Sequence, residues 1–265
     1  MESNFTGPKD YQKYFHGRDY LQTYFDFDQC DIQGPSWLLF ILKQLHQTFS
    51  SGDVRGDTLI DIGTGPSIYH LLSACECFRE IIATDYLDRN LQELERWLKM
   101  EPGAFDWSPV VKYVCELEGD SEQWAKKEEK LRKTVKQFLK CDITKKNPLE
   151  PLALPQADCL LTCLCLEAAC KDLDVYGKAM KNITTLLKPG GHFLLFLVLQ
   201  ETYYTVGQHR FSCLYLEKEQ VEQIVQETGY CVEHLEVAPS LEKDVSTLAD
   251  YDAMMFLIAR KMKGV

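Results

Sequence analysis

One stretch of this chain, residues 59–69, constrains its fold more than any other. It reads Leu-Ile-Asp-Ile-Gly-Thr-Gly-Pro-Ser-Ile-Tyr, an apolar run that ends in an acid and a Gly-x-Gly turn, after which a helical pattern begins. Glycine allows a positive φ and lets a ligand approach the backbone closely. Nucleotide-like cofactors bind at such turns, at the carboxyl edge of an open α/β sheet. The stretch therefore predicts a strand, a tight turn and a helix, with a cofactor at the turn.

The residues around the turn favour a cofactor without phosphate groups. The dinucleotide fingerprint needs a third glycine, but that position holds Ile68. Asp61, just before the turn, is also unfavourable beside a pyrophosphate. S-adenosylmethionine, with its adenosine, its cationic sulfonium and its amino-acid end, fits better. NAD stays open as the alternative.

A second acid supports a nucleoside-containing ligand. Residues 80–86 are expected to form the next strand, which ends at Asp85. A carboxylate about 20 residues after a glycine turn accepts hydrogen bonds from ribose hydroxyls. Strand, turn, helix, strand and acid together are far more specific than the two glycines alone.

Composition limits the possible functions and locations. A length of 265 residues with 45% hydrophobic residues predicts one domain, residues 1–265, with a large core. The net charge of −11 argues against nucleic-acid or anionic-membrane partners, which need a basic surface. The longest apolar run, residues 193–199, is too short to span a bilayer, and the first residues do not resemble a secretory leader. We therefore expect a cytoplasmic protein. A monomer is also expected, although the sequence does not determine the oligomeric state.

The eleven cysteines are expected to be reduced thiols in such a location. Four of them cluster between residues 159 and 170, but in a spacing that no structural zinc site uses. No metal is therefore expected.

Predicted strands and helices alternate along the chain. Helices are expected over 37–49, 87–100 and 217–228, and strands over 157–163, 192–199 and 254–260, with another strand ending near 141–143. The aromatic-rich residues within 1–50 are expected to form a cap or lid, and residues 101–140 an insertion. This order predicts an α/β protein with a mostly parallel, doubly wound sheet.

Several segments together resemble one enzyme family. They are Gly-Arg-Asp-Tyr-Leu at 17–21, the glycine turn at 61–69, Glu-Pro-Gly-Ala-Phe-Asp-Trp at 101–107, Leu-Lys-Cys-Asp at 139–142 and Leu-Glu-Ala-Ala-Cys at 166–170. The chain resembles, over essentially its whole length, the nicotinamide, indolethylamine, phenylethanolamine and thioether methyltransferases. The resemblance implies a Rossmann-like class I methyltransferase fold with an N-terminal helical lid and S-adenosylmethionine as cofactor.

The resemblance also implies a set of cofactor contacts. Phe25 stands where several relatives have tyrosine, and Cys163 where relatives often have threonine, so each changes a single contact. The implied contacts are Tyr20, Phe25, Gly63, Thr64, Gly65, Tyr69, Asp85, Tyr86, Asn90, Asp142, Ile143 and Cys163.

Three positions bear on the choice of substrate. Members that methylate nicotinamide carry an aspartate at the position of Leu197 and serines at those of Glu201 and Cys213. With Leu197 here, a bound carboxamide would lose a buried partner, at a cost of roughly 1–3 kcal/mol. This comparison argues against nicotinamide as the preferred substrate.

Three acids instead match the amine-binding positions of phenylethanolamine-methylating relatives, namely Glu167, Glu201 and Asp250. Carboxylates bind an ammonium ion, and Glu201 or Glu167 would then accept its proton as a general base. Catalytic roles are thus expected for Glu201, Glu167 and Tyr20. The expected substrate contacts are Tyr20, Tyr24, Leu164, Glu167, Leu197, Glu201, Tyr204, Cys213 and Asp250.

These residues predict methyl transfer to a small aromatic alkylamine, of which tryptamine is an example. Nicotinamide, a phenylethanolamine-type amine or a thioether are the alternative acceptors. Two other classes stay open: a module that binds S-adenosylmethionine without turnover, and a nicotinamide-linked oxidoreductase.

Overall fold

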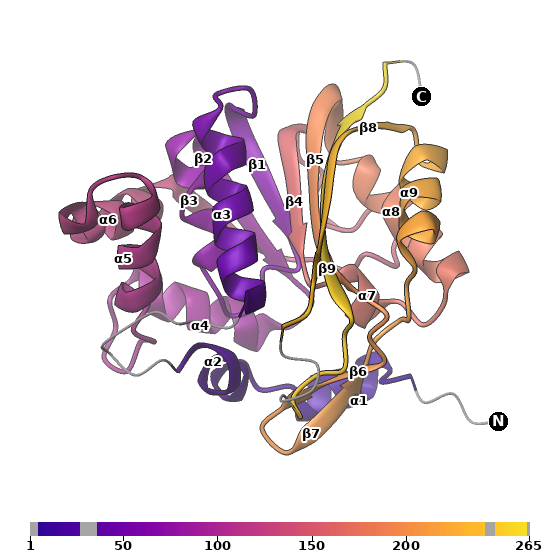
Figure 1. Ribbon diagram of the computed structural model, residues 1–265, viewed down its shortest axis with the longest axis horizontal. Coiled ribbons are helices and arrows are strands. Elements are labelled where there is room, and N and C mark those ends of the chain that lie inside the picture. The colour runs from indigo at the N-terminus through magenta and orange to yellow at the C-terminus, as the bar shows by residue number, and fades with distance from the viewer. Residues whose placement is uncertain (1–4, 27–35, 242–246, 264–265) are drawn as a thin grey trace.

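A seven-stranded sheet forms the centre of the computed structural model, which describes residues 5–26, 36–241 and 247–263 (Figure 1). The strand order is β3-β2-β1-β4-β5-β9-β8. The strands are β1 Gly56–Ile62, β2 Phe78–Asp85, β3 Val135–Lys140, β4 Ala157–Cys163, β5 Leu187–Leu199, β8 Tyr230–Pro239 and β9 Ala253–Lys261. The first five in this order pair in parallel, and β9 runs antiparallel to both β5 and β8. The mostly parallel sheet predicted from the sequence is thereby confirmed.

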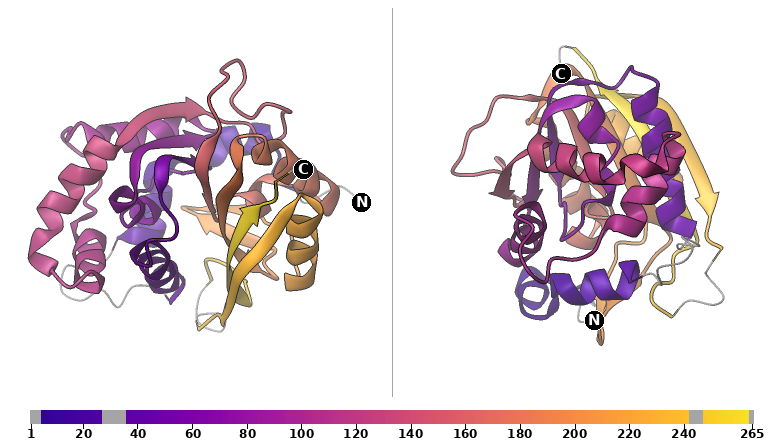
Figure 2. Two further views of the ribbon diagram at one scale, coloured as in Figure 1. Left: turned by 90° about the horizontal axis from the view of Figure 1, so that it is seen from above. Right: turned by 90° about the vertical axis from the view of Figure 1, so that its left-hand side faces the viewer.

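Helices cover both faces of the sheet, as the two views of Figure 2 show. The longer helices are α3 Ser36–Ser50, α4 Asp88–Leu98, α5 Ser108–Leu117, α6 Trp124–Thr134, α8 Leu173–Thr184 and α9 Lys218–Glu227. In one buried cluster, the helices α3, α4, α5 and α6 pack on one face of the sheet. In a second cluster, α8 and α9 pack on the other face. Successive residues of β5 alternate between the clusters: Leu197 lies in the second and Val198 in the first. This alternation is the ordinary side-chain period of a strand, and it decides which residues can reach the site.

A lid lies across the carboxyl ends of the parallel strands. It consists of α1 Pro8–Tyr14, α2 Gly17–Phe25 and a hairpin of β6 Tyr203–Val206 and β7 His209–Ser212, all at the lower end of Figure 1. Thr6 and Ser212 exchange two backbone-to-hydroxyl hydrogen bonds, and the Tyr24 hydroxyl donates to the Thr205 carbonyl at 2.9 Å. These bonds fasten the helices to the hairpin, which the sequence did not predict.

One expectation about secondary structure is corrected and another is confirmed. The glycine turn is followed by two short 3-10 helices, η1 Tyr69–Leu71 and η2 Ala74–Glu76, rather than by an α-helix. Every residue from 66 to 75 is buried, so this segment has no solvent-exposed face of the kind that an amphipathic helix needs. Residues 135–140 form β3 and pair with β2, which confirms the strand that was expected to end near 141–143.

No helix within the described ranges combines the length and apolar character that crossing a bilayer requires.

Candidate functional site

An elongated cavity lies between the carboxyl ends of the central strands and the lid. Sixteen of the residues expected at the site line it: Tyr20, Tyr24, Gly63, Thr64, Gly65, Tyr69, Asp85, Tyr86, Asp142, Ile143, Cys163, Leu164, Glu167, Glu201, Tyr204 and Cys213. They come from positions across almost the whole chain. Parallel strands bring the residues at their carboxyl ends to one edge of the sheet, and α2 and the β6–β7 hairpin of the lid add the others.

The glycine turn forms a narrow wall of this cavity. Gly63 has a φ of +72°, and a Cβ built there would lie 2.1 Å from the sulfur of Cys165, so no other residue fits. The backbone N–H of Thr64 donates to the Thr84 carbonyl at 2.8 Å, which ties the turn to β2. The turn therefore presents bare backbone to whatever occupies the cavity.

Asp85 fixes the other side of the turn. Its Oδ2 accepts the N–H of Gly65 at 2.9 Å, and its Oδ1 accepts from the N–H of Leu87 at 2.7 Å and the amide of Asn90 at 3.0 Å. Burial raises the pKa of this carboxyl to about 6, although the same three donors act in the opposite direction. Asn90 itself does not line the cavity; it orients Asp85, which does.

The charge of the cavity discriminates between cofactors. Asp85, Asp142, Glu167 and Glu201 line it, and no lysine, arginine or histidine stands among its described lining residues. An acidic wall of this kind attracts a cation and repels a pyrophosphate. The cradle around Gly63 and the carboxylate of Asp85 fit the nucleoside and sulfonium of S-adenosylmethionine, and they do not suit NAD.

Sequence and structure comparisons agree with this geometry. The model of the NNMT/PNMT/TEMT family matches residues 2–262. The chain belongs to this family. Indolethylamine N-methyltransferase of Oryctolagus cuniculus is 50% identical over 100% of both chains. Nicotinamide N-methyltransferase of Sus scrofa is 52% identical over 99% of this chain and 98% of the relative.

Phenylethanolamine N-methyltransferase of Macaca mulatta is 44% identical over 85% of this chain and 80% of the relative. Among solved structures, magnesium protoporphyrin IX methyltransferase from Synechocystis PCC 6803 with bound SAH has a TM-score of 0.58 at 10% identity. The match covers 96% of this chain and 99% of that one, and it shows the shared fold. This family member is thus an enzyme, an S-adenosylmethionine-dependent N-methyltransferase.

The cavity also carries two buried carboxyl groups. Glu167 lies in the first turn of α7 Leu166–Ala169 after β4, and Glu201 follows β5; they are 2% and 5% exposed. Burial raises the pKa of Glu167 to about 7 and that of Glu201 to about 8, where the neighbouring Glu167 adds to the effect of burial. Glu167 Oε1 accepts a long hydrogen bond of 3.4 Å from the N–H of Val198, and Oε2 has no partner within the described part of the chain.

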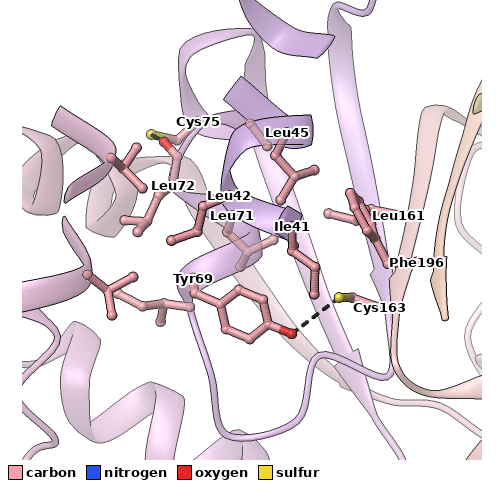
Figure 3. Packing of buried hydrophobic residues seen from close by; sticks show 14 of the residues in the cluster. Ile41, Leu42, Leu45, Tyr69, Leu71, Leu72, Cys75, Leu161, Cys163 and Phe196 are labelled. Carbon is pink, nitrogen blue, oxygen red and sulfur yellow. Dashed lines mark hydrogen bonds between the residues drawn. The ribbon is translucent and has the colours of Figure 1, made fainter. Parts of the chain in front are cut away.

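Aromatic rings from the lid enclose these carboxyl groups. The rings of Tyr20 and Tyr24 lie 5.1 Å apart, and the ring of Tyr204 stacks on Phe211 at 5.4 Å. Burial raises the pKa of the Tyr20 hydroxyl well above its ordinary value. Near the turn, the Tyr69 hydroxyl lies 3.2 Å from the thiol of Cys163, the residue that replaces the expected threonine (Figure 3).

Four expected contacts do not line the cavity. Asn90 acts behind Asp85, as described above. Phe25 packs in the core against Tyr69 and Trp107, with ring centroids 5.2 and 4.9 Å apart. Leu197 lies on the face of β5 that α8 and α9 cover, because Val198 takes the orientation toward the cavity.

Asp250 is the fourth of these residues. It accepts the N–H groups of Thr202 at 2.8 Å and of Tyr203 at 3.1 Å, together with the Thr202 hydroxyl. Burial would raise the pKa of Asp250, but these hydrogen bonds outweigh it and lower the pKa. The carboxylate therefore shapes the start of the β6–β7 hairpin.

The structure also adds residues that sequence reasoning did not place at the site. Tyr11, Trp37, Cys165 and Tyr251 line the cavity. Tyr11 lies near Asp85 and is hydrogen-bonded to Tyr204, and burial raises the pKa of its hydroxyl. The dense aromatic run of the lid was the signal for Tyr11, but the sequence alone does not say which of those rings turn inward.

Proposed function

We propose that this enzyme transfers a methyl group from S-adenosylmethionine to the nitrogen of a small aromatic alkylamine. The supporting observation is the pair of buried carboxyl groups, Glu167 and Glu201, which line the same cavity as the glycine turn and the tyrosines of the lid. Aromatic walls suit a ring of indole or phenyl size. The acids suit an amine at the end of its side chain.

The raised pKa values give amine binding a measurable signature. In the empty enzyme near neutral pH, Glu201, with a pKa of about 8, carries a proton. An alkylammonium ion can bind beside the ionised carboxylate, or the neutral amine can bind beside the carboxylic acid. Before binding, the ammonium ion and the carboxylic acid each carry one such proton. The bound pair carries only one in either route, so about one proton is released to the solvent.

Residues of this chain remove the proton and hold the substrate in place. When bound, S-adenosylmethionine supplies an electrophilic methyl group. Glu201 or Glu167 removes the ammonium proton, which exposes the nitrogen lone pair, and each carboxyl has a pKa close to neutral pH, as a general base requires. Tyr20 and Tyr24 close the cavity and keep water out, which favours transfer by holding the reacting groups in place.

Nicotinamide is the second candidate, because a relative of 52% identity is a nicotinamide N-methyltransferase. Its ring nitrogen has no proton to lose at neutral pH, so its methylation makes no use of a general base. Glu201 and Cys213 occupy the cavity positions where the nicotinamide-methylating members were expected to carry serines. Leu197 is not among the described residues that line the cavity, so this position does not support the choice.

Calorimetry with enzyme saturated with S-adenosylhomocysteine separates the two candidates. Tryptamine, phenylethylamine and nicotinamide are titrated at pH 7 in buffers of different ionisation enthalpy. We expect close to one proton released for each amine, almost none for nicotinamide, and a smaller release from the amines with Glu201→Gln. Amine binding without proton release, or a higher kcat/KM for nicotinamide than for every amine, would contradict the proposal.

We further expect the chain to act as one domain and one monomer in the cytoplasm, on small molecules rather than on nucleic acid or membranes. The lid and the sheet share one cavity, which supports the single domain. Light scattering of the purified enzyme tests the monomer.

A further inference from the structure

A buried polar pair beneath the glycine turn takes no part in the chemistry proposed above. Asp61 lies in β1 and is 0% exposed, and His70 lies in η1 and is 2% exposed. His70 Nε2 is 2.7 Å from Asp61 Oδ2. Neither residue lines the cavity.

The two side chains depend on each other. Within the described residues, Asp61 Oδ1 and His70 Nδ1 have no hydrogen-bond partner. A buried carboxylate whose side chain has a single close donor is strongly destabilised when that donor is removed. The imidazole nitrogen at Nε2 therefore carries the proton and donates it to Asp61, because the opposite tautomer would leave a buried N–H at Nδ1 unpaired.

Short connections lead from this pair to the wall of the cavity. His70 Nε2 is also 3.4 Å from the hydroxyl of Thr64, which lines the cavity. The Asp61 carbonyl accepts the Thr84 hydroxyl at 2.8 Å, and Thr84 in turn accepts the N–H of Thr64. His70 also follows Tyr69, whose hydroxyl meets Cys163 in the cavity wall (Figure 3).

We propose that His70 is a positioning residue for cofactor binding. Its Nε2–H holds the Asp61 carboxylate, and the pair fixes residues 63–65 in the backbone conformation that S-adenosylmethionine contacts. This inference rests on the proposed cofactor position at the turn and is independent of the identity of the amine. When His70 is replaced by a residue without a donor, the Asp61 carboxylate is left unpaired. It then moves toward other hydrogen-bond donors, and the turn at residues 63–65 shifts with it.

The test compares His70→Leu, which removes the donor, with His70→Gln, whose amide can still reach Asp61. Affinity for S-adenosylhomocysteine is measured by calorimetry on the full chain, together with KM for each substrate and kcat. We expect Kd to rise roughly tenfold for the leucine variant, which matches the loss of one net hydrogen bond. The glutamine variant should stay within about threefold of wild type, and kcat and the KM of the amine should change little in both.

Gln44→Leu is the matched control. Gln44 is also buried, at 6% exposed, and donates one side-chain hydrogen bond of 2.7 Å to Glu236, but it does not contact the turn. This variant should lose stability and keep its cofactor affinity. In the double variant Asp61→Asn/His70→Leu, the loss should not exceed that of His70→Leu alone, because no unpaired charge remains.

Wild-type affinity in His70→Leu, an equal loss in Gln44→Leu, or no rescue by glutamine would overturn the proposal. If His70→Leu does not fold, His70→Asn, whose shorter side chain does not span the distance from Nε2 to Asp61, replaces it. Failure of the wild-type enzyme to bind S-adenosylhomocysteine would instead refute the cofactor site itself.

Discussion

In the absence of ligands, Glu201 is expected to make the stability of the protein depend on pH. Burial raises the pKa of this carboxyl from 4.5 to about 8, so the folded protein holds the proton more tightly than the unfolded chain. The contribution of Glu201 to the free energy of unfolding is therefore greatest below pH 4.5, and it falls as the pH rises toward 8. At about 1.4 kcal/mol for each pH unit, the whole interval corresponds to roughly 4–5 kcal/mol. Structural relaxation around the ionised group makes this an upper bound.

Glu201→Gln removes the ionisation while keeping nearly the same shape. We expect the free energy of unfolding of the variant, relative to wild type, to increase by about 2–4 kcal/mol between pH 5 and pH 9. Urea unfolding followed by circular dichroism at each pH measures it, and Glu116→Gln, an exposed acid, is the control. If wild type and Glu201→Gln showed parallel pH curves, the pKa of the carboxyl would not be raised by burial, and the match to neutral pH that supports its role as a general base would be lost.

Three further expectations follow from the site. Asp85→Ala should weaken S-adenosylhomocysteine binding roughly 10- to 100-fold in calorimetry, more than amine binding, because it removes the proposed ribose acceptor and the anchor of Gly65; unchanged affinity would count against the cofactor position. Glu167→Gln should lower kcat about 10²- to 10⁴-fold for primary alkylamines but little for a pyridine substrate, and the wild-type kcat/KM for amines should rise toward alkaline pH; equal effects on both substrates would argue against a proton acceptor. Leu197→Asp should destabilise the fold by about 3 kcal/mol or more in urea unfolding, because Leu197 is 1% exposed in the core; a stable variant with raised nicotinamide turnover would instead place residue 197 at the site.

Features that depend on a short stretch of sequence were predictable from the sequence alone. The glycine turn and Asp85 imply a strand end with a cofactor, since only bare backbone lets a ligand approach so closely. The alternation of strands and helices implies a mostly parallel sheet, and the carboxyl ends of its parallel strands form one side of the cavity. The family segments add the identity of the enzyme class, which the family model confirms.

The direction and the surroundings of each side chain were decided only by the tertiary structure. Leu197 and Val198 are neighbours in an apolar strand, and nothing local says which of them turns toward the cavity. Asp250 and Asn90 carry the right chemical groups, but the fold places neither of them among the described residues that line the cavity. The raised pKa values of Glu167 and Glu201 likewise arise from burial by the lid, which depends on contacts between residues about 200 positions apart, such as Thr6 and Ser212. A sequence specifies which groups are present, whereas desolvation and competition for hydrogen bonds depend on what the fold packs around them.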